Sequence, residues 1–189
     1  MSKIWLTSDW HFGHDREFIW GARGFNSIQE MNETIIAKHN SLVEPDDIVY
    51  CLGDCCLGPD LEANKKCLQS LKGQIKIIRG NHCTDKRVEM YKTLPNVEYI
   101  GWAEMIKYQG YHFYLSHYPT ITSNMDEGAP LKARVLNLYA HTHQQCSNFY
   151  NDNPLQYHVG VDSHNCYPVS LDTIIEEIKA KKDECLSFL

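Results

Sequence analysis

The sequence predicts an α/β fold in which helices flank two facing sheets. Over the first half of the chain, short apolar runs rich in β-branched or aromatic residues alternate with segments of helical pattern. Residues 97–115 differ, because they read as consecutive strands with no helix between them. Alternating strands and helices followed by a run of strands are compatible with two packed sheets that are covered by helices.

Each predicted strand ends at a polar or glycine-containing turn, which is the usual boundary of a short buried strand. The first five strands are expected at residues 3–7, 47–52, 74–78, 111–115 and 134–139. A further strand is expected around residues 156–161.

Three helices are predicted from their capping residues and apolar periodicity. Ser27 and Glu30 have the spacing of a capping box and indicate a helix that begins directly after Ser27. A second helix is expected over about residues 60–71, where Gly73 marks its end, and a third over about 171–181.

The chain of 189 residues has no repeat, low-complexity tract or Gly/Ser linker, and we expect a single domain spanning residues 1–189. A chain of this length buries roughly 70% of its unfolded surface, which is enough for one good core. The net charge is −6 and there is no dense Lys/Arg cluster, which disfavours binding to extended duplex nucleic acid. A small anionic ligand stays open, because bound divalent cations supply positive charge locally.

The N-terminus has one lysine and a short apolar run, and no stretch reaches the roughly 20 apolar residues that cross a bilayer. We therefore expect a cytoplasmic protein without a membrane partner. The eight cysteines contain no C-x-x-C pair, so reduced and mostly buried thiols are expected rather than disulfides or a zinc site.

Residues of the types that bind metal ions occur immediately after five of the predicted strands. They occur in Asp9-Trp10-His11, Gly53-Asp54, Gly80-Asn81-His82, Ser116-His117 and Ala140-His141-Thr142-His143. The carboxyl ends of strands form the binding crevice of an open α/β sheet, so these side chains can converge. A single histidine at a strand end is usually hydrogen-bonded or on the surface, but five successive blocks indicate a common site. Asp, Asn and His together suit manganese, iron or zinc rather than a soft thiolate-binding metal.

These blocks, in this order, resemble the signature of the calcineurin-like metallophosphoesterases. The length of the chain is similar to that of the small bacterial and phage members of this family, as are residues 7–14 and His117-Tyr118-Pro119. The resemblance implies a four-layer α/β/β/α sandwich with two mixed sheets, and a metal-dependent phosphoesterase activity.

The same resemblance implies two divalent metal ions. It assigns Asp9, His11 and His143 to one ion, Asn81, His117 and His141 to the other, and Asp54 to a bridge between them. Two cations roughly 3.5–4 Å apart share a hydroxide, lower its pKa and neutralise the phosphoryl group during in-line attack. Manganese is the expected metal, with iron, zinc and nickel as alternatives.

His82 is the histidine of the five blocks to which the resemblance assigns no metal. In the family this imidazole faces the substrate and is thought to protonate the leaving oxygen. Cys83 departs from the family pattern, which commonly has an acidic residue there, and this leaves open which acceptor orients His82; Asp85 is nearby in sequence. Ala140 replaces a usual glycine, which indicates that this position does not need a positive φ angle.

Other polar residues are weaker candidates. His14 and Arg23 lie in the loop after the first block and could contact a substrate phosphate, Arg23 through its bidentate donors. A polar loop that could line the mouth of the cleft contains Asp162, His164 and Asn165. Structural roles are expected for His39 and His112.

The expected function is hydrolysis of a phosphate ester, with a phosphodiesterase acting on a small nucleotide-like substrate as the first choice. A phosphomonoesterase acting on a small metabolite or a phosphoprotein is the nearest alternative, because one fold hosts many specificities. Two further alternatives are a nuclease and a metal-free scaffold that binds other proteins. The sequence leaves the physiological substrate and the oligomeric state open.

Overall fold

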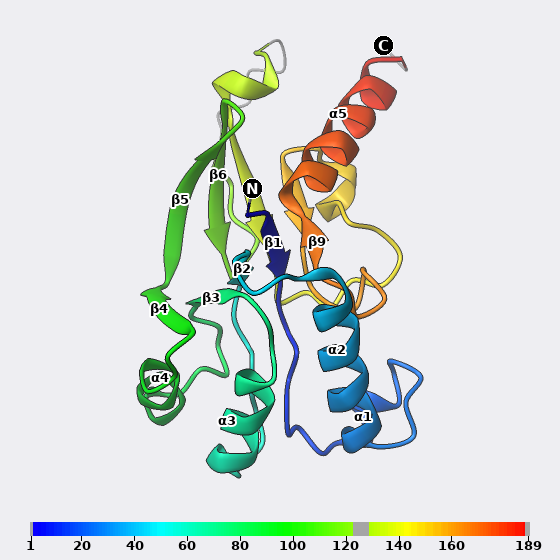
Figure 1. The fold of residues 1–189 in the computed structure, drawn as a ribbon. Coiled ribbons are helices and arrows are strands. Elements are labelled where there is room, and N and C mark those ends of the chain that lie inside the picture. Colours follow the sequence, from blue (N-terminus) through cyan, green and yellow to red (C-terminus); the bar gives the residue numbers. More distant parts are fainter. Residues whose placement is uncertain (1, 123–128, 188–189) are drawn as a thin grey trace.

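The computed structural model describes residues 2–122 and 129–187, and its strands form two sheets (Figure 1). The first sheet has the order β4-β3-β2-β1-β9. Its strands are β1 (Ile4–Thr7), β2 (Ile48–Cys51), β3 (Gln74–Ile78), β4 (Val97–Gly101) and β9 (Val169–Ser170). Strands β1 to β4 run parallel to one another, whereas β9 pairs with β1 in the antiparallel direction.

The second sheet has the order β5-β6-β7-β8. It consists of β5 (Ala103–Tyr108), β6 (Tyr111–Ser116), β7 (Val135–Tyr139) and β8 (Gln156–His158). The β5–β6 pair is antiparallel, and β6, β7 and β8 are parallel. Both sheets are therefore mixed, which confirms the predicted fold class and the consecutive strands expected over 97–115.

The helices pack against two separate apolar clusters. Helices α2 (Ile28–Leu42), α3 (Leu61–Gln69) and α4 (Asp85–Lys92) contribute Met31, Ile35, Leu68 and Val88 to one cluster, together with Val49 and Ile75 of the first sheet. Helix α5 (Leu171–Ser187) contributes Ile174, Ile175 and Ile178 to the other, which also holds Leu6, Phe113 and Leu138 from both sheets. Figure 1 shows α5 at the opposite end of the view from α2, α3 and α4.

Side-chain caps are present at the starts of α2 and α3, and the one at Ser27 was predicted. Ser27 accepts a hydrogen bond from the backbone N–H of Glu30 at 3.1 Å, and Asp60 accepts from Glu62 and Ala63 at the start of α3. The Glu30 carboxylate departs from a capping box, because it accepts from the backbone N–H of Asn26 at 2.8 Å rather than from that of Ser27.

Several elements differ from the sequence expectations. The strand expected over 156–161 pairs only at 156–158, because the Val161 N–H donates to the carbonyl of Ser8 instead of a strand partner. Helix α5 extends to Ser187, beyond the predicted end at 181. Helices α1 (Glu17–Trp20) and α4 and strand β9 were not predicted. Among the described residues, no helix combines the length and apolar character needed to cross a membrane.

Candidate metal centre

The loops that follow β1, β2, β3, β6 and β7 carry the candidate ligands, and backbone hydrogen bonds align the first two of these loops. The Asp9 N–H donates to Gly53 O at 3.1 Å, and the His11 N–H donates to Asp54 O at 3.0 Å. The parallel pairing of β1 and β2 thus continues into the loops. As a result, Asp9 and Asp54 leave the sheet side by side.

Five candidate ligands have backbone conformations that are uncommon for residues with a side chain. Their φ angles lie between 48° and 71°, and they are Asp9, His11, Asp54, His141 and His143. A left-handed conformation of this kind costs about 1–3 kcal/mol per residue and persists where the surrounding structure enforces it. Such strain concentrates at binding and catalytic sites.

One group of donor atoms is formed by Asp9, His11 and His143. One ligand atom from each lies within 4.8 Å of the other two. Asp9 Oδ1 and both ring nitrogens of His11 are buried and have no hydrogen-bond partner among the described residues. Leaving buried polar atoms without partners is costly, and a cation bound here would satisfy Asp9 Oδ1 and one of the two His11 nitrogens.

A second group is formed by Asp9, Asp54 and His117, again with one atom of each within 4.8 Å of the others. His117 Nδ1 lies 2.8 Å from Leu52 O, and a carbonyl can only accept, so Nδ1 carries the proton. The Nε2 atom of the neutral ring is then an acceptor, although it faces Asn81 Oδ1 at 2.8 Å and Asp54 Oδ2 at 3.4 Å. Acceptors that converge in this way fit a metal cation.

His141 lies at the edge of these groups. Its backbone N–H donates to Asp9 Oδ2 at 3.2 Å, and its ring centroid is 5.0 Å from that of His117. The side chain is exposed and belongs to neither group of donor atoms. Asp9, rather than Asp54, is the residue that the two groups share.

Two glycines allow the second and third loops to approach each other. A Cβ atom at Gly80 would lie 2.2 Å from Asp54 Oδ1, and one at Gly53 would lie 2.6 Å from His117 Nδ1. Gly53 also has a φ of +104°, which side-chain-bearing residues rarely adopt. The close approach places Asp54 Oδ1 2.9 Å from the His82 N–H, which donates to it.

Burial controls the protonation of these groups in the absence of a cation. It raises the pKa of Asp9 and lowers that of His11 well below its usual value. Burial also opposes ionisation of Asp54, but with no cation bound a protonated His117, the His82 N–H and the charge of His11 together outweigh burial and lower the pKa of this carboxyl. Because burial disfavours the charged forms of these side chains, a divalent cation bound between them would stabilise the site.

The sequence model of the family described as "Calcineurin-like phosphoesterase" matches residues 2–186. The chain belongs to the calcineurin-like phosphoesterase family. It is therefore a metal-dependent hydrolase of phosphate esters.

The chain is also similar to other proteins of comparable length. An uncharacterised protein of Methanocaldococcus jannaschii is 34% identical over 186 residues, which cover 96% of this chain and 94% of that protein. The gene 66 protein of Mycobacterium phage D29 is 28% identical over 197 residues, covering 89% and 93% of the two chains. A crystal structure of a protein of unknown function from Aquifex aeolicus has the same fold, with a TM-score of 0.72, 21% identity and coverage of 93% and 99%.

Arg23 and Asp162 brace the first group of donor atoms in this phosphoesterase. The Arg23 guanidinium donates to both Asp162 oxygens at 2.8 and 3.0 Å and to Asp9 O at 2.8 Å. Asp162 Oδ2 also accepts from His143 Nδ1 at 2.8 Å. Because the Arg23 side chain is only 4% exposed and already bonded, its geometry does not support the expected contact with a substrate phosphate. The sequence indicates only that Asp162 belongs to a polar loop that could line the cleft mouth, so this bracing role was not predicted.

The neighbouring loop residues His164 and Asn165 also bond within the protein. His164 Nε2 lies 2.9 Å from His158 O, and Asn165 is an exposed residue whose carbonyl accepts from Lys38 at 2.8 Å. These contacts fix the loop that carries Asp162. They give His164 and Asn165 no contact with the candidate ligands.

His82 is held by its backbone and leaves its ring accessible. Its carbonyl accepts from Arg87 at 2.8 Å, and its ring centroid lies 5.7 Å from that of His11. Asp85 does not orient the ring, because it is exposed and pairs with Arg79 at 2.7 Å. Cys83 is buried, and its sulfur accepts from the Gly80 N–H at 3.3 Å. The ring of His82 has no hydrogen bond to any described residue.

His14 is the remaining candidate for substrate binding. Its ring centroid lies 5.6 Å from that of His11 and 5.7 Å from that of the exposed Phe18. Burial, followed by the charge of His82, lowers the pKa of His14. The structure therefore places His14 beside the centre, where contact with a substrate is geometrically allowed. Ala140 is buried and does not have a positive φ, as the sequence analysis expected.

The cysteines behind the centre are thiols. Cys51 and Cys55 flank the Gly53-Asp54 loop, with their sulfur atoms 3.2 Å apart, and burial raises both pKa values. No disulfide joins the cysteines whose side chains the structure describes, while the side chain of Cys185 lies outside the described part. Buried thiols with raised pKa values are unreactive, which suits a packing role.

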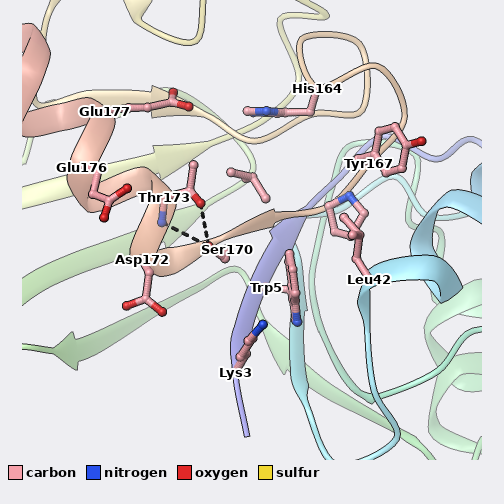
Figure 2. A pocket seen from close by; sticks show the side chains of 12 residues that line it. Lys3, Trp5, Leu42, His164, Tyr167, Ser170, Asp172, Thr173, Glu176 and Glu177 are labelled. Atoms are coloured by element: carbon pink, nitrogen blue, oxygen red, sulfur yellow. Dashed lines mark hydrogen bonds between the residues drawn. The ribbon is translucent and has the colours of Figure 1, made fainter.

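A separate pocket lies between β1, β9 and α5 (Figure 2). Lys3 and Trp5 line one side of it, and Asp172 and Glu176 of α5 line the other. None of the candidate ligands lines this pocket. It lies toward the beginning of β1, whereas Asp9 follows the end of that strand.

Proposed function

We propose that this phosphoesterase hydrolyses a phosphodiester at a centre that holds two divalent cations. The proposal is supported by the two groups of donor atoms that share Asp9. In the first group, buried donor atoms lack hydrogen-bond partners, and in the second group, several acceptor atoms converge. One group alone would suit a single cation. Two groups joined by a carboxylate suit two.

The proposed ligands are those assigned by the resemblance. They are Asp9, His11 and His143 for one cation, Asn81, His117 and His141 for the other, and Asp54 between them, next to Asp9, which belongs to both donor groups. When bound, the cations supply Lewis acidity that activates water and neutralises the phosphoryl oxygens. The protein positions its donors beforehand: Leu52 O fixes the tautomer of His117, and Asp162 fixes that of His143.

His82 is the proposed general acid. Its backbone is held by Asp54 and Arg87, its ring lies beside His11, and nothing described holds the ring nitrogens. A free imidazole at this position can give a proton to the leaving oxygen of an ester. Protonation matters most for alkoxide leaving groups such as ribose hydroxyls, which is why a nucleotide-like diester is the proposed substrate. His14 is proposed to contact the substrate beside it.

The test is metal removal and restoration with two chromogenic esters. Protein that has been exhaustively treated with a chelator should be inactive and should recover activity with manganese, because the donors are oxygen and imidazole. Parallel assays with iron, zinc and nickel rank the alternatives. Activity that persists without metal overturns the proposal.

The choice of ester decides between the diesterase and its nearest alternative. With manganese bound, bis(4-nitrophenyl) phosphate should be hydrolysed with a higher kcat/KM than 4-nitrophenyl phosphate. The opposite order would assign a phosphomonoesterase. Manganese stoichiometry measured on the same samples should approach two per chain, and a stoichiometry of one would contradict the binuclear centre.

A further inference from the structure

Three exposed aromatic side chains belong to segments that adjoin the candidate metal centre. Phe18 is 69% exposed, Trp102 63% and Tyr118 43%. Single exposed apolar residues are common on protein surfaces and need no explanation. Here, however, Phe18 packs on His14 and Tyr118 packs on His117 and His141, with ring centroids 5.1 and 4.8 Å apart. The Phe18 and Tyr118 rings are therefore already in contact with histidines of the site.

Trp102 differs, because its ring packs on Arg79 rather than on a histidine of the site. It stands at the corner where the chain passes from β4 of the first sheet to β5 of the second. Ala103, the next residue, pairs with Ser116, so one further step of the antiparallel register sets Trp102 opposite His117. The Arg79 N–H, donating to Gly101 O at 2.6 Å, fixes the other side of the corner.

Arg79 covers one side of the indole ring. Its guanidinium carbon lies 4.9 Å from the ring centroid, and its Nη2 donates to Asp85 at 2.7 Å. The Asp85 carboxylate thus holds the guanidinium against the ring. With 63% of Trp102 exposed, the indole still presents a large area to solvent. Arg79 is two residues before Asn81, so it directly precedes the loop that carries this candidate ligand.

We propose that Trp102, backed by Arg79, is a stacking platform for the nucleobase of the substrate. Planar aromatic bases stack on exposed indole rings and on guanidinium groups, and every base has such a face. A rigid indole is suited to this because little conformational entropy is lost when it binds. The inference rests on the proposed function, since the phosphate of the same nucleotide would lie at the metal centre. It assigns the substrate to esters that carry a nucleobase.

The platform is tested with two diesters that have the same leaving group. The nitrophenyl ester of thymidine 5′-phosphate carries a base, whereas methyl nitrophenyl phosphate carries none. Trp102→Ala should lower kcat/KM for the thymidine ester by about 5- to 150-fold, mainly through KM, and leave the methyl ester within about twofold. Trp102→Phe should retain most of the activity on the thymidine ester, because it keeps a stacking face.

Met105→Ala is the matched control. Met105 is a 52% exposed apolar residue of β5, three positions from Trp102 and farther from the candidate ligands in the strand register. It should leave both esters unchanged. If Trp102→Ala lowers kcat/KM equally on both esters, or on neither, the platform is overturned. Metal-dependent hydrolysis of the methyl ester in the same assay would leave the proposed function intact.

A binding measurement separates the two proposals if hydrolysis fails. Equilibrium dialysis of thymidine 5′-monophosphate against wild type, Trp102→Ala and Met105→Ala requires no turnover. Weaker binding to Trp102→Ala alone, by the same factor of about 5 to 150, supports the platform. Equal binding to all three proteins, or none to wild type, overturns it. Absence of hydrolysis of every ester would overturn the proposed function only.

Discussion

Asp162 accepts a hydrogen bond from Nδ1 of His143 at 2.8 Å, although the two residues lie 19 positions apart in the chain. The bond fixes the proton on Nδ1, so that Nε2 of His143 is free to bind a cation. Arg23 holds the same carboxylate and also donates to the carbonyl of Asp9. The brace therefore connects two of the three donors of the first group, and it explains why Arg23 is buried rather than available to a substrate.

Asp162→Asn should weaken metal binding without removing a ligand. An amide can still accept from His143, but it no longer carries the charge that orients the imidazole and the Arg23 guanidinium. Carboxylates that orient ligating histidines typically contribute 10- to 100-fold to metal affinity, and we expect a loss of this size in manganese affinity. Metal titration of the apoprotein measures it directly.

The control for this variant is Asp46→Asn, which changes an exposed aspartate with the same loss of charge. It should leave manganese affinity unchanged. An affinity of Asp162→Asn equal to that of wild type would show that the brace stabilises the loop but has no effect on the centre. Comparing the unfolding midpoints of the three proteins separates a folding defect from a metal-binding defect.

Asp54→Asn should reduce activity more than His14→Ala. Asp54 belongs to the second donor group and is the proposed bridge, so its loss weakens both cation sites, whereas His14 contacts only the substrate in our proposal. We expect a fall in kcat/KM of about 100-fold or more for Asp54→Asn and a smaller effect for His14→Ala. Steady-state kinetics at saturating manganese make the comparison. Similar losses in both variants would count against the bridging role.

The sequence predicted the elements that local patterns encode. The strand at 74–78 was placed at its observed bounds, because it combines β-branched residues with a clear Gly73 boundary. Ser27 identified the start of α2, since a capping side chain is a local signal, and the start of the second helix was expected near residue 60, next to the observed Leu61. In contrast, α4 begins at Asp85, after Thr84, whose side chain makes no capping bond, and β9 has two residues, too few for any periodicity.

The candidate site was predictable in its residue types and only partly in its arrangement. Motif order identified the donor residues, but the sequence could not show that Asp9 joins both groups or that Arg23 reaches Asp162, 139 positions away. Such contacts depend on how the loops pack. The exposure of Trp102 is a property of the corner between two sheets, and no local pattern marks it.

His39 should make the folded protein sensitive to acid. It is buried, Nε2 lies 2.9 Å from Lys72 O, and its ring packs edge-on against Trp10. Burial lowers its pKa to about 4, partly offset by the bond to the Lys72 carbonyl, while the Lys72 charge lowers it further. Because the unfolded chain binds this proton near pH 6.5 and the folded one only near 4, stability is lost as pH falls through that window.

The expected size of this effect is about 2 kcal/mol between pH 7.5 and pH 5. His39→Gln keeps a donor for the Lys72 carbonyl but cannot titrate. The free energy of unfolding, measured by urea denaturation at both pH values, should therefore fall more in wild type than in the variant by about that amount. Parallel pH dependence in the two proteins would exclude His39 as the cause.

His82→Ala tests the proposed general acid through the leaving group. A nitrophenolate leaves readily without a proton, whereas an alkoxide does not, and acid catalysis typically contributes 10²- to 10⁴-fold. The variant should therefore lose about that factor in kcat/KM on an alkyl or ribosyl ester. Its loss on a nitrophenyl ester should be much smaller.

Metal content decides how any loss is interpreted, because His82 lies beside His11 and its backbone N–H donates to Asp54. Replacing the side chain keeps that N–H, so manganese binding should be little changed. Equal losses on both esters with full metal content would show that the imidazole binds the phosphoryl oxygens rather than moving a proton. A loss of manganese would instead place His82 among the ligands.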